Sequence, residues 1–126
     1  MNREASQEGV KIEALSAITL SIRDMAASVR FYETLGFTIK HGGVNEDFTS
    51  LACGASFLNL MVQTHAPVEG WGRLIVHVSD VDAVYRRALR AGLTPSRVPS
   101  DAPWGERYFH ISDPDGHEVS IAKPLA

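Results

Sequence analysis

Four residues in the second half of the chain have side chains that could carry out proton transfer. His110 and Glu118 are candidate general bases, because an imidazole and a carboxylate can each accept a proton from a reacting group. Arg73 and Tyr108 could stabilise the negative charge that develops on an enolate or oxyanion. This combination suits isomerisation or elimination next to a carbonyl, and it would need no metal ion.

The same region offers a second chemistry, which is metal binding. His77, His110 and Glu118 together supply two imidazoles and one carboxylate, a donor set that suits an iron or zinc centre. The fixed positive charge of Arg73 disfavours a cation beside it. A purely structural interpretation is also open: Arg73 pairs with Glu118 across a sheet, and the two histidines are hydrogen-bonded core residues.

Thiol chemistry is not favoured. Cys53 is the single cysteine, so it forms no disulfide within the chain, and nothing basic stands beside it to activate the thiol. The sequence also has no Cys pair and no HExxH run, which excludes the common thiolate and zincin metal sites. Cysteine usage of this kind predicts a reducing, cytoplasmic location.

An internal repeat supplies the elements that must position these side chains. A shift of 56 residues places Asp24 on Asp80 and Gly36 on Gly92, and apolar positions between them also match. Asp24 can cap the start of a helix in the first copy. Gly36 and Gly92 can end the two helices, because glycine tolerates the left-handed backbone conformation.

Each copy is predicted to be a βαβββ unit, which makes the fold class α+β. Ser79 with Asp82 three residues later resembles a capping box at the start of the second helix. Strand-like stretches separated by Gly, Pro and Asp follow each helix. They cover residues 37–40, 48–53 and 56–63 in the first copy, and 93–98, 108–112 and 117–122 in the second.

These elements divide one compact domain into segments. Residues 1–10 are expected to be a disordered tail, 11–63 module one, 64–72 a linker and 73–126 module two. The run DPDG at residues 113–116 fits a tight hairpin turn. The loop over residues 99–106, which contains Trp104, is a candidate lid.

Composition limits the partners of the protein. Of its 126 residues, 44% are hydrophobic and 21% are charged, which predicts an ordinary globular domain. A net charge of -3 has the wrong sign for neutralising nucleic-acid phosphates. The sequence offers neither an apolar run long enough for a membrane span nor a secretion signal in its first residues. We therefore expect neither nucleic acid nor a membrane as a partner.

Two stretches carry a family resemblance. Residues 24–37, which end in FYETLGF, and residues 107–118, RYFHISDPDGHE, resemble the vicinal oxygen chelate superfamily of glyoxalase I, bleomycin-resistance proteins, fosfomycin-resistance enzymes and extradiol dioxygenases. The resemblance covers about residues 12–124. It implies two βαβββ modules forming a curved mixed sheet around a cavity, and chains that commonly pair as homodimers. It is specific for the fold and not for the activity.

The resemblance also implies where a metal ion would be held. Metal enzymes of this family use His, Glu or Gln on the cavity faces of the first and last strands of each module. By position, these slots here are Ala17, Asn59, Arg73 and Ser120. None is a usual ligand, since alanine has no lone pair and arginine is a cation. We therefore expect no metal centre at these slots, and no cofactor.

The period-two alternation sorts the strand residues onto two faces, and residues such as Phe109 and Ile111 suit the helix-packed side. The cavity side carries the predicted ligand-binding residues Phe57, Asn59, Arg73, His77, Tyr108, His110 and Glu118, with Trp104 beside them and Thr19, Ser21, Met61, Ile75 and Ser112 on the same face. Trp71 and Trp104 could stack on a flat ligand.

These observations favour a binding protein that holds a small aromatic or amphipathic molecule without a metal ion. Two enzymatic alternatives stay open. One is a metal-dependent lyase or dioxygenase with displaced ligands His77, His110 and Glu118, and the other is a metal-free isomerase or lyase.

Overall fold

Each half of the chain folds as a βαβββ unit, which confirms the predicted α+β class. The computed structural model describes residues 9–65 and 70–126, so residues 1–8 of the expected tail and 66–69 of the expected linker lie outside the described residues. The elements are β1 (Ala17–Ile22), α1 (Met25–Leu35), β2 (Thr38–His41), β3 (Phe48–Cys53), β4 (Ser56–Val62), β5 (Arg73–His77), α2 (Val81–Arg90), β6 (Ser100–Asp101), β7 (Glu106–Ser112) and β8 (Glu118–Pro124).

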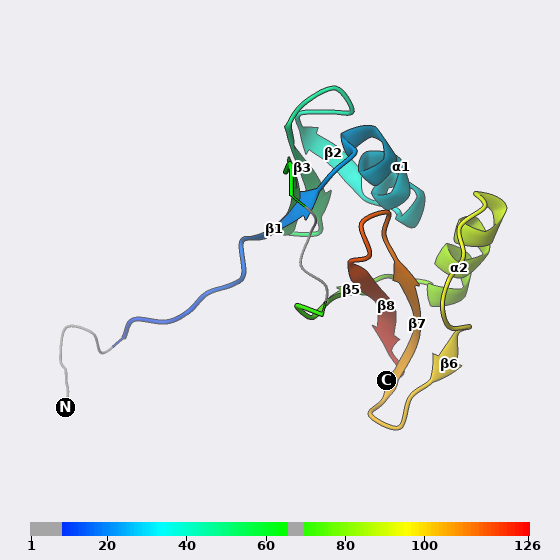
Figure 1. Ribbon diagram of the computed structural model, residues 1–126. Helices are drawn as coiled ribbons and strands as arrows, with labels where there is room; N and C mark the ends of the chain where they lie inside the picture. The colour runs from blue at the N-terminus through cyan, green and yellow to red at the C-terminus, as the bar shows by residue number, and fades with distance from the viewer. Residues whose placement is uncertain (1–8, 66–69) are drawn as a thin grey trace.

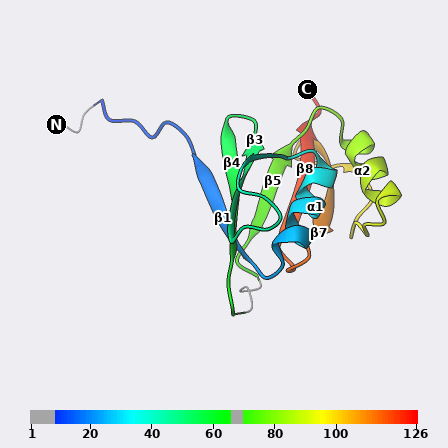
Figure 2. The same cartoon turned by 90° about the horizontal axis from the view of Figure 1, so that it is seen from above.

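The strands form two sheets of four, one from each unit. The first sheet has the order β1-β4-β3-β2 and the second has the matching order β5-β8-β7-β6. In each sheet the first strand pairs in parallel with the last strand of its unit, and the other pairs are antiparallel. Figures 1 and 2 show the two sheets with the two helices packed beside them. Neither helix in the described part of the chain has the length and apolar character that a membrane span requires.

The residues that cap the starts of the two helices are those that the internal repeat places at matching positions. The Asp24 side chain accepts a hydrogen bond from the Ala27 amide at 3.1 Å, as predicted. At the second helix the predicted capping box at Ser79 is wrong, because Asp80 is the capping residue and accepts from the Ala83 amide at 3.0 Å. Asp80 has the extended conformation that a capping residue needs, so the cap falls where the repeat places it.

The segment after the second helix differs from the prediction. Residues 93–98 form no strand, and strand pairing begins only with the two residues of β6. Pro95 lies within this segment and Pro99 follows it, and a proline has no amide N–H to donate to a ladder. The candidate lid over residues 99–106 includes β6 and the turn of the hairpin β6–β7, where the Ala102 amide donates to the Glu106 carbonyl at 2.7 Å.

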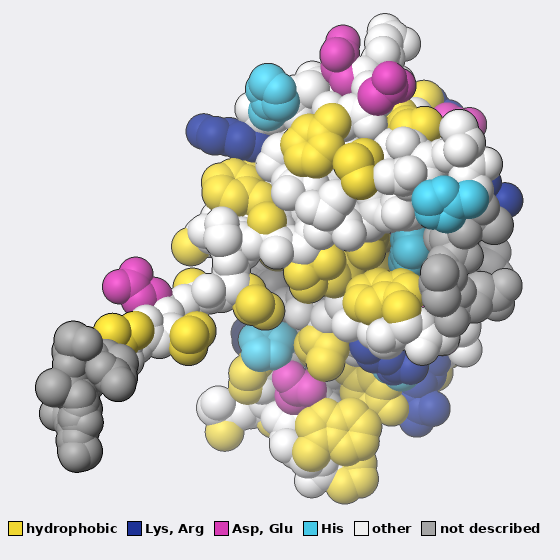
Figure 3. Space-filling view, turned by 60° about the vertical axis from the view of Figure 1, so that its left-hand side comes forward, with side chains coloured by type: hydrophobic (Ala, Val, Ile, Leu, Met, Phe, Trp, Pro, Cys, Tyr) yellow, Lys and Arg dark blue, Asp and Glu magenta, His cyan; other side chains and the backbone are white. Residues whose placement is uncertain are grey.

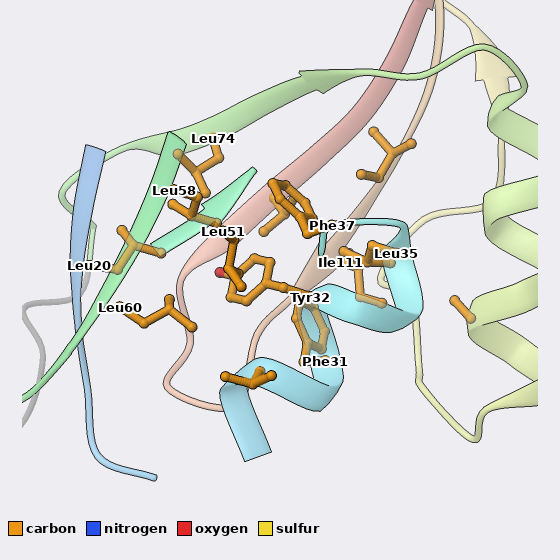
Figure 4. Packing of buried hydrophobic residues seen from close by; sticks show 14 of the residues in the cluster. Leu20, Phe31, Tyr32, Leu35, Phe37, Leu51, Leu58, Leu60, Leu74 and Ile111 are labelled. Carbon is orange, nitrogen blue, oxygen red and sulfur yellow. The ribbon is translucent and has the colours of Figure 1, made fainter. Parts of the chain in front are cut away.

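Alternating strand residues of both sheets enter one shared core. The inward residues include Leu20 and Ile22 of β1, while Ala17 and Thr19 on the other face are exposed. The core continues through α1 to β7 and β8, where Phe109 is fully buried. Figure 4 shows side chains of both halves of the chain pointing toward one another. The predicted sorting of the two strand faces is therefore confirmed.

The turn over residues 113–116 ties the two units together. The Tyr32 hydroxyl donates to Asp113 Oδ2 at 2.7 Å within the core, and Arg23 forms an ion pair with Asp115 at 3.0 Å. Gly116 closes the turn with a φ of 89°, as its position in the turn predicts. Burial, followed by the Asp113 carboxylate, raises the pKa of Tyr32 well above its ordinary value, so the hydroxyl keeps the proton that it donates.

Candidate functional site

Three of the predicted site residues meet on the outer face of the second sheet. Arg73 on β5 lies opposite Glu118 on β8, and its Nη2 donates to Glu118 Oε1 at 2.6 Å. Its Nη1 lies 2.6 Å from Nε2 of His110, which comes from β7. The cross-sheet pairing of Arg73 with Glu118 was one of the alternatives that the sequence left open, and the structure confirms it.

This arrangement determines the state of His110. An arginine can only donate, so the ring nitrogen that faces Arg73 must be an unprotonated acceptor. Burial lowers the pKa of His110, and the charges of Arg73 and Arg97 lower it further, against the opposing effect of Glu118. His110 is thus a neutral imidazole held beside two cations, and its acceptor nitrogen is occupied by Arg73, so it can accept a proton only when that hydrogen bond opens.

A second cluster lies at the other end of β5. His77 Nε2 is 2.9 Å from Glu106 Oε2, and the Trp104 indole donates to Glu106 Oε1 at 3.0 Å. The hydrogen bonds from His77 and then Trp104 lower the pKa of the Glu106 carboxyl. Glu106 is a residue that the sequence analysis missed, because it falls at the end of the predicted loop over residues 99–106, which has no periodic pattern.

The structure does not bring His77 together with His110 and Glu118. Arg73 and His77 are the first and last residues of β5, which separates their Cα atoms by about 13 Å at the usual rise per residue. His77 is engaged by Glu106, and the other two residues are engaged by Arg73. Within residues 9–65 and 70–126, no group of three or more His, Cys, Asp or Glu side chains is placed to hold a metal ion.

The four positions at which the family resemblance implies metal ligands carry no set of side chains that fits an ion. Ala17 has no donor atom, and the Arg73 guanidinium is committed to Glu118 and His110. Asn59 donates to Thr19 Oγ1 at 3.2 Å and accepts from Ser50 at 2.7 Å. Ser120, the fourth slot, is a buried hydroxyl and not an imidazole or carboxylate. This donor set is unlike that of a first-row divalent metal centre.

Aromatic rings form a row beside the Arg73 cluster. The ring centroids of Trp104 and Tyr108 are 5.5 Å apart, and those of Tyr108 and His110 are 5.1 Å apart. Arg97 lies over the Tyr108 ring, 5.2 Å from its centroid, within the range of a cation–π contact. Trp104 is 66% exposed and so offers a flat apolar surface to solvent. The sequence analysis missed Arg97, which lies in the segment wrongly predicted as a strand.

The first-sheet candidates belong to a neighbouring groove. Phe57 lies on β4 and Ile75 on β5, and both line an apolar groove of about 190 Å³ where the two sheets meet. Cys53 also lines this groove, and burial raises the pKa of its thiol, so the thiolate is disfavoured. Asn59 lies further along β4, within its own hydrogen bonds to Thr19 and Ser50.

His117 is a further residue whose role the sequence did not indicate. Its Nδ1 lies 2.8 Å from the Trp71 indole nitrogen, which can only donate, so Nε2 carries the proton. That Nε2 lies 2.8 Å from the Ser21 carbonyl oxygen and donates to it, which links β8 to β1. Trp71, expected beside the ligand, therefore stands edge-on to His117 at the joint between the two units.

Sequence comparison identifies relatives over most of the chain. Residues 14–121 match the family described as the Glyoxalase/Bleomycin resistance protein/Dioxygenase superfamily. An uncharacterized protein of Mycobacterium bovis is 34% identical over 90 residues, which cover 71% of this chain and 54% of that protein. The chain therefore spans about half the length of this curated relative.

Solved structures share the fold. A glyoxalase/bleomycin resistance protein/dioxygenase from Nocardioides superposes with a TM-score of 0.69 at 24% identity, over 95% of this chain and 89% of that chain. A bleomycin-binding protein complexed with bleomycin superposes with a TM-score of 0.70 at 22% identity, over 89% of this chain and 98% of that chain. With its paired βαβββ units and a sequence match that spans nearly all of them, the chain belongs to the Glyoxalase/Bleomycin resistance protein/Dioxygenase superfamily.

Proposed function

We propose that the protein binds a small aromatic or amphipathic molecule on the outer face of its second sheet, without a metal ion at the family slots. The observation that carries this proposal is Arg73. Its guanidinium occupies a slot where relatives place a metal ligand, and it is held there by Glu118 and His110. A cation fixed in this way repels a metal ion and leaves the site to organic ligands.

The chemistry of the surrounding face supports a flat ligand. Trp104 offers an exposed ring face with the buried Tyr108 ring 5.5 Å from it, and Ile75, which is 63% exposed, extends the apolar surface toward the first sheet. His77 and Glu106 supply polar groups at one end, and Arg73, His110 and Glu118 supply them at the other. A ring that stacks on Trp104 would have hydrogen-bonding partners at both ends of the face.

Fluorescence titration tests the proposal. The probes are bleomycin, which one solved structural neighbour binds, and anilinonaphthalene sulfonate, a planar amphipathic anion. We expect saturable quenching of tryptophan fluorescence that is lost in Trp104→Phe and kept in Trp71→Phe, since only Trp104 lies on the proposed face. Equal quenching in both variants would place the ligand elsewhere.

Metal addition tests the second part of the proposal. Zn²⁺, Ni²⁺, Mn²⁺ or Fe²⁺ should leave the melting temperature unchanged. An ion raises the melting temperature only by binding to the folded state, and the proposal gives these ions no site. Stabilisation that a chelator reverses would contradict metal independence and favour the metal-dependent lyase or dioxygenase.

The neutral His110 favours a second candidate, metal-free proton transfer. Once Arg73 releases the acceptor nitrogen of this unprotonated imidazole, the ring can accept a proton while the cations stabilise the resulting enolate. Small 2-oxo acids in D₂O, followed by proton NMR, would show deuterium entering next to the carbonyl. We expect this exchange to be lost in His110→Gln, and the absence of exchange above buffer would count against catalysis.

We also propose that the protein works as a homodimer in the cytoplasm. The family resemblance supports pairing of two chains, and the single cysteine supports a reducing compartment. The mass of the protein in solution tests the first point, and fractionation of the source cells tests the second.

A further inference from the structure

Two grooves adjoin at the border between the two units. One, of about 190 Å³, is the groove lined by Phe57 and Ile75. The other, of about 310 Å³, runs past the ends of α1 and β5 to α2. Phe37, Cys53 and Val76 line both grooves, so the two form one passage, which we call the seam groove. Figure 3 shows hydrophobic side chains gathered along the border between the units.

The walls of the seam groove are mostly apolar. Leu58 and Leu74 line one end and come from different sheets, and Figure 4 shows them close together with Phe37 nearby. Cys53 and Val76, in the middle, are only partly buried, although both pack against the core. An apolar chain that covered this surface would gain free energy by removing it from water.

A cation lies at the other end of the seam groove. Arg87 of α2 lines this end, and its Nη1 is held against the end of α1, where a Cβ added to Gly36 would come within 3.6 Å of it. Among the described residues, no carboxylate forms an ion pair with Arg87, and no Asp or Glu lines either groove. The other polar side chains here are Ser79 and His77, and His77 is engaged by Glu106. The guanidinium can therefore accept an anionic ligand.

The dimensions of the seam groove suit a short acyl chain. The groove follows β5 and the residue after it over residues 74–78, a length of about 13 Å at the usual rise per residue. A saturated chain of about eight to ten carbon atoms is similarly long, given a carbon–carbon bond of about 1.5 Å. A cavity of about 150 Å³ accommodates benzene, so each part of the groove has room for several methylene groups.

We propose that the seam groove binds a single-chain carboxylate of the fatty-acid type. Its acyl chain lies along Phe37, Cys53 and Val76, and its carboxylate lies on Arg87. A planar guanidinium can donate two parallel hydrogen bonds to a carboxylate, so Arg87 selects the anion while the apolar walls hold the chain. This site goes beyond the proposed function, because Arg73 and Trp104 on the outer face line neither groove.

The position of Cys53 gives a direct measure of occupancy. It is the single cysteine and lies where the two grooves adjoin, so its rate of alkylation by N-ethylmaleimide should fall when a ligand covers it. The probe is octanoate at about pH 7.5, where a carboxylic acid is ionised. We expect saturable protection of Cys53 together with a higher melting temperature. Octanol, which has the same chain without the charge, should need about a tenfold higher concentration, and acetate should not protect.

Arg87→Gln tests the carboxylate contact. It should weaken protection by octanoate about tenfold and leave protection by octanol unchanged, because only the charged ligand loses a partner. Arg86→Gln is the matched control: it removes the same charge from the neighbouring exposed position of α2, which lines neither groove, and should keep full protection. Absence of protection in the natural sequence, or equal weakening in the two variants, would overturn the proposal.

Trp104→Phe separates this site from the ligand face of the proposed function. Protection of Cys53 by octanoate should persist in this variant, since Trp104 lies outside the seam groove. Loss of protection would place octanoate on the outer face and overturn the acyl site. If bleomycin and anilinonaphthalene sulfonate fail to quench tryptophan fluorescence while octanoate still protects Cys53, the proposed function fails and the acyl site stands.

Discussion

Arg73 is the residue on which the candidate site depends. It places a cation on the outer face of the second sheet, and it binds both of the groups that the sequence suggested as bases. Its side chain and that of Glu118 are both partly exposed, so their ion pair contributes little to folding, about 0–1 kcal/mol. The consequence of this pair is therefore electrostatic: it sets the charge of the site, and Arg73 adds to the effect of burial in lowering the pKa of His110.

Replacing Arg73 should change the titration of His110. In Arg73→Met the pKa of His110 should rise, because one of the two cations that lower it is gone while Glu118 still favours the imidazolium. NMR of the imidazole protons across a pH series measures this directly. Arg97→Met is the comparison variant and should give a smaller rise, since the effect of Arg97 is the weaker of the two. An unchanged pKa in Arg73→Met would contradict the effect assigned to Arg73.

The same histidine predicts a dependence of stability on pH. The pKa of His110 is lower in the folded chain than its ordinary value of about 6.5. On acidification the unfolded chain takes up this proton first, so the stabilising contribution is complete above about pH 6.5 and is lost as the pH falls toward the folded-state pKa. In His110→Gln this part of the loss should vanish from melting temperatures measured across the same range. A variant with the full acid loss would contradict the assignment.

At the scale of elements, local chemistry predicted most of what was observed. Asp24 caps the first helix, Gly36 and Gly92 follow the ends of the two helices, and the turn at 113–116 forms as predicted. These features were predictable because each one depends on only a few neighbouring residues. The helix ends are alike: the Phe37 amide donates to the Tyr32 carbonyl at 3.0 Å and the Leu93 amide to the Ala88 carbonyl at 2.9 Å.

Two proline residues and the register between strands explain the features that the sequence patterns did not predict correctly. The strand expected over residues 93–98 failed because Pro95 and Pro99 interrupt any ladder there. The separation of His77 from His110 follows from cross-strand register, which a single sequence does not specify. The pairing of Arg73 with Glu118 was predictable as one alternative, since strand alternation puts both on one face.

The helix-ending glycines give a prediction at this scale. Gly36 and Gly92 have φ values of 117° and 82°. A side chain in left-handed backbone costs about 1–2 kcal/mol, so Gly92→Ala should lower the free energy of unfolding by that amount. Gly36→Ala should cost at least as much, since a φ of 117° lies beyond the left-handed well. Urea denaturation measures both. Gly92→Asn is the control and should cost less, because asparagine tolerates this conformation.

At the scale of the whole molecule, the two units are joined by polar contacts as well as by their shared core. Tyr32 reaches Asp113, Arg23 reaches Asp115, and His117 reaches the Ser21 carbonyl. All of these contacts come from the turn at 113–116 and the residue after it, so this one turn fixes the second sheet against the first unit. The proposed ligand site on the second sheet therefore takes its position relative to the first unit from this joint and the shared core.

Removing the Tyr32 hydroxyl tests how much this joint contributes. Asp113 Oδ1 accepts from the amides of Asp115 and His117, but Oδ2 has Tyr32 as its partner, and the carboxylate is buried. Tyr32→Phe leaves that oxygen unpaired, so the free energy of unfolding should fall by about 1–3 kcal/mol.

Tyr85→Phe is the matched control, because Tyr85 packs edge-on against Phe109 and its hydroxyl has no hydrogen-bond partner within the described residues. It should change stability by less than about 0.5 kcal/mol. Equal losses in the two variants, measured by urea denaturation, would show that packing and not the bond to Asp113 holds the units together.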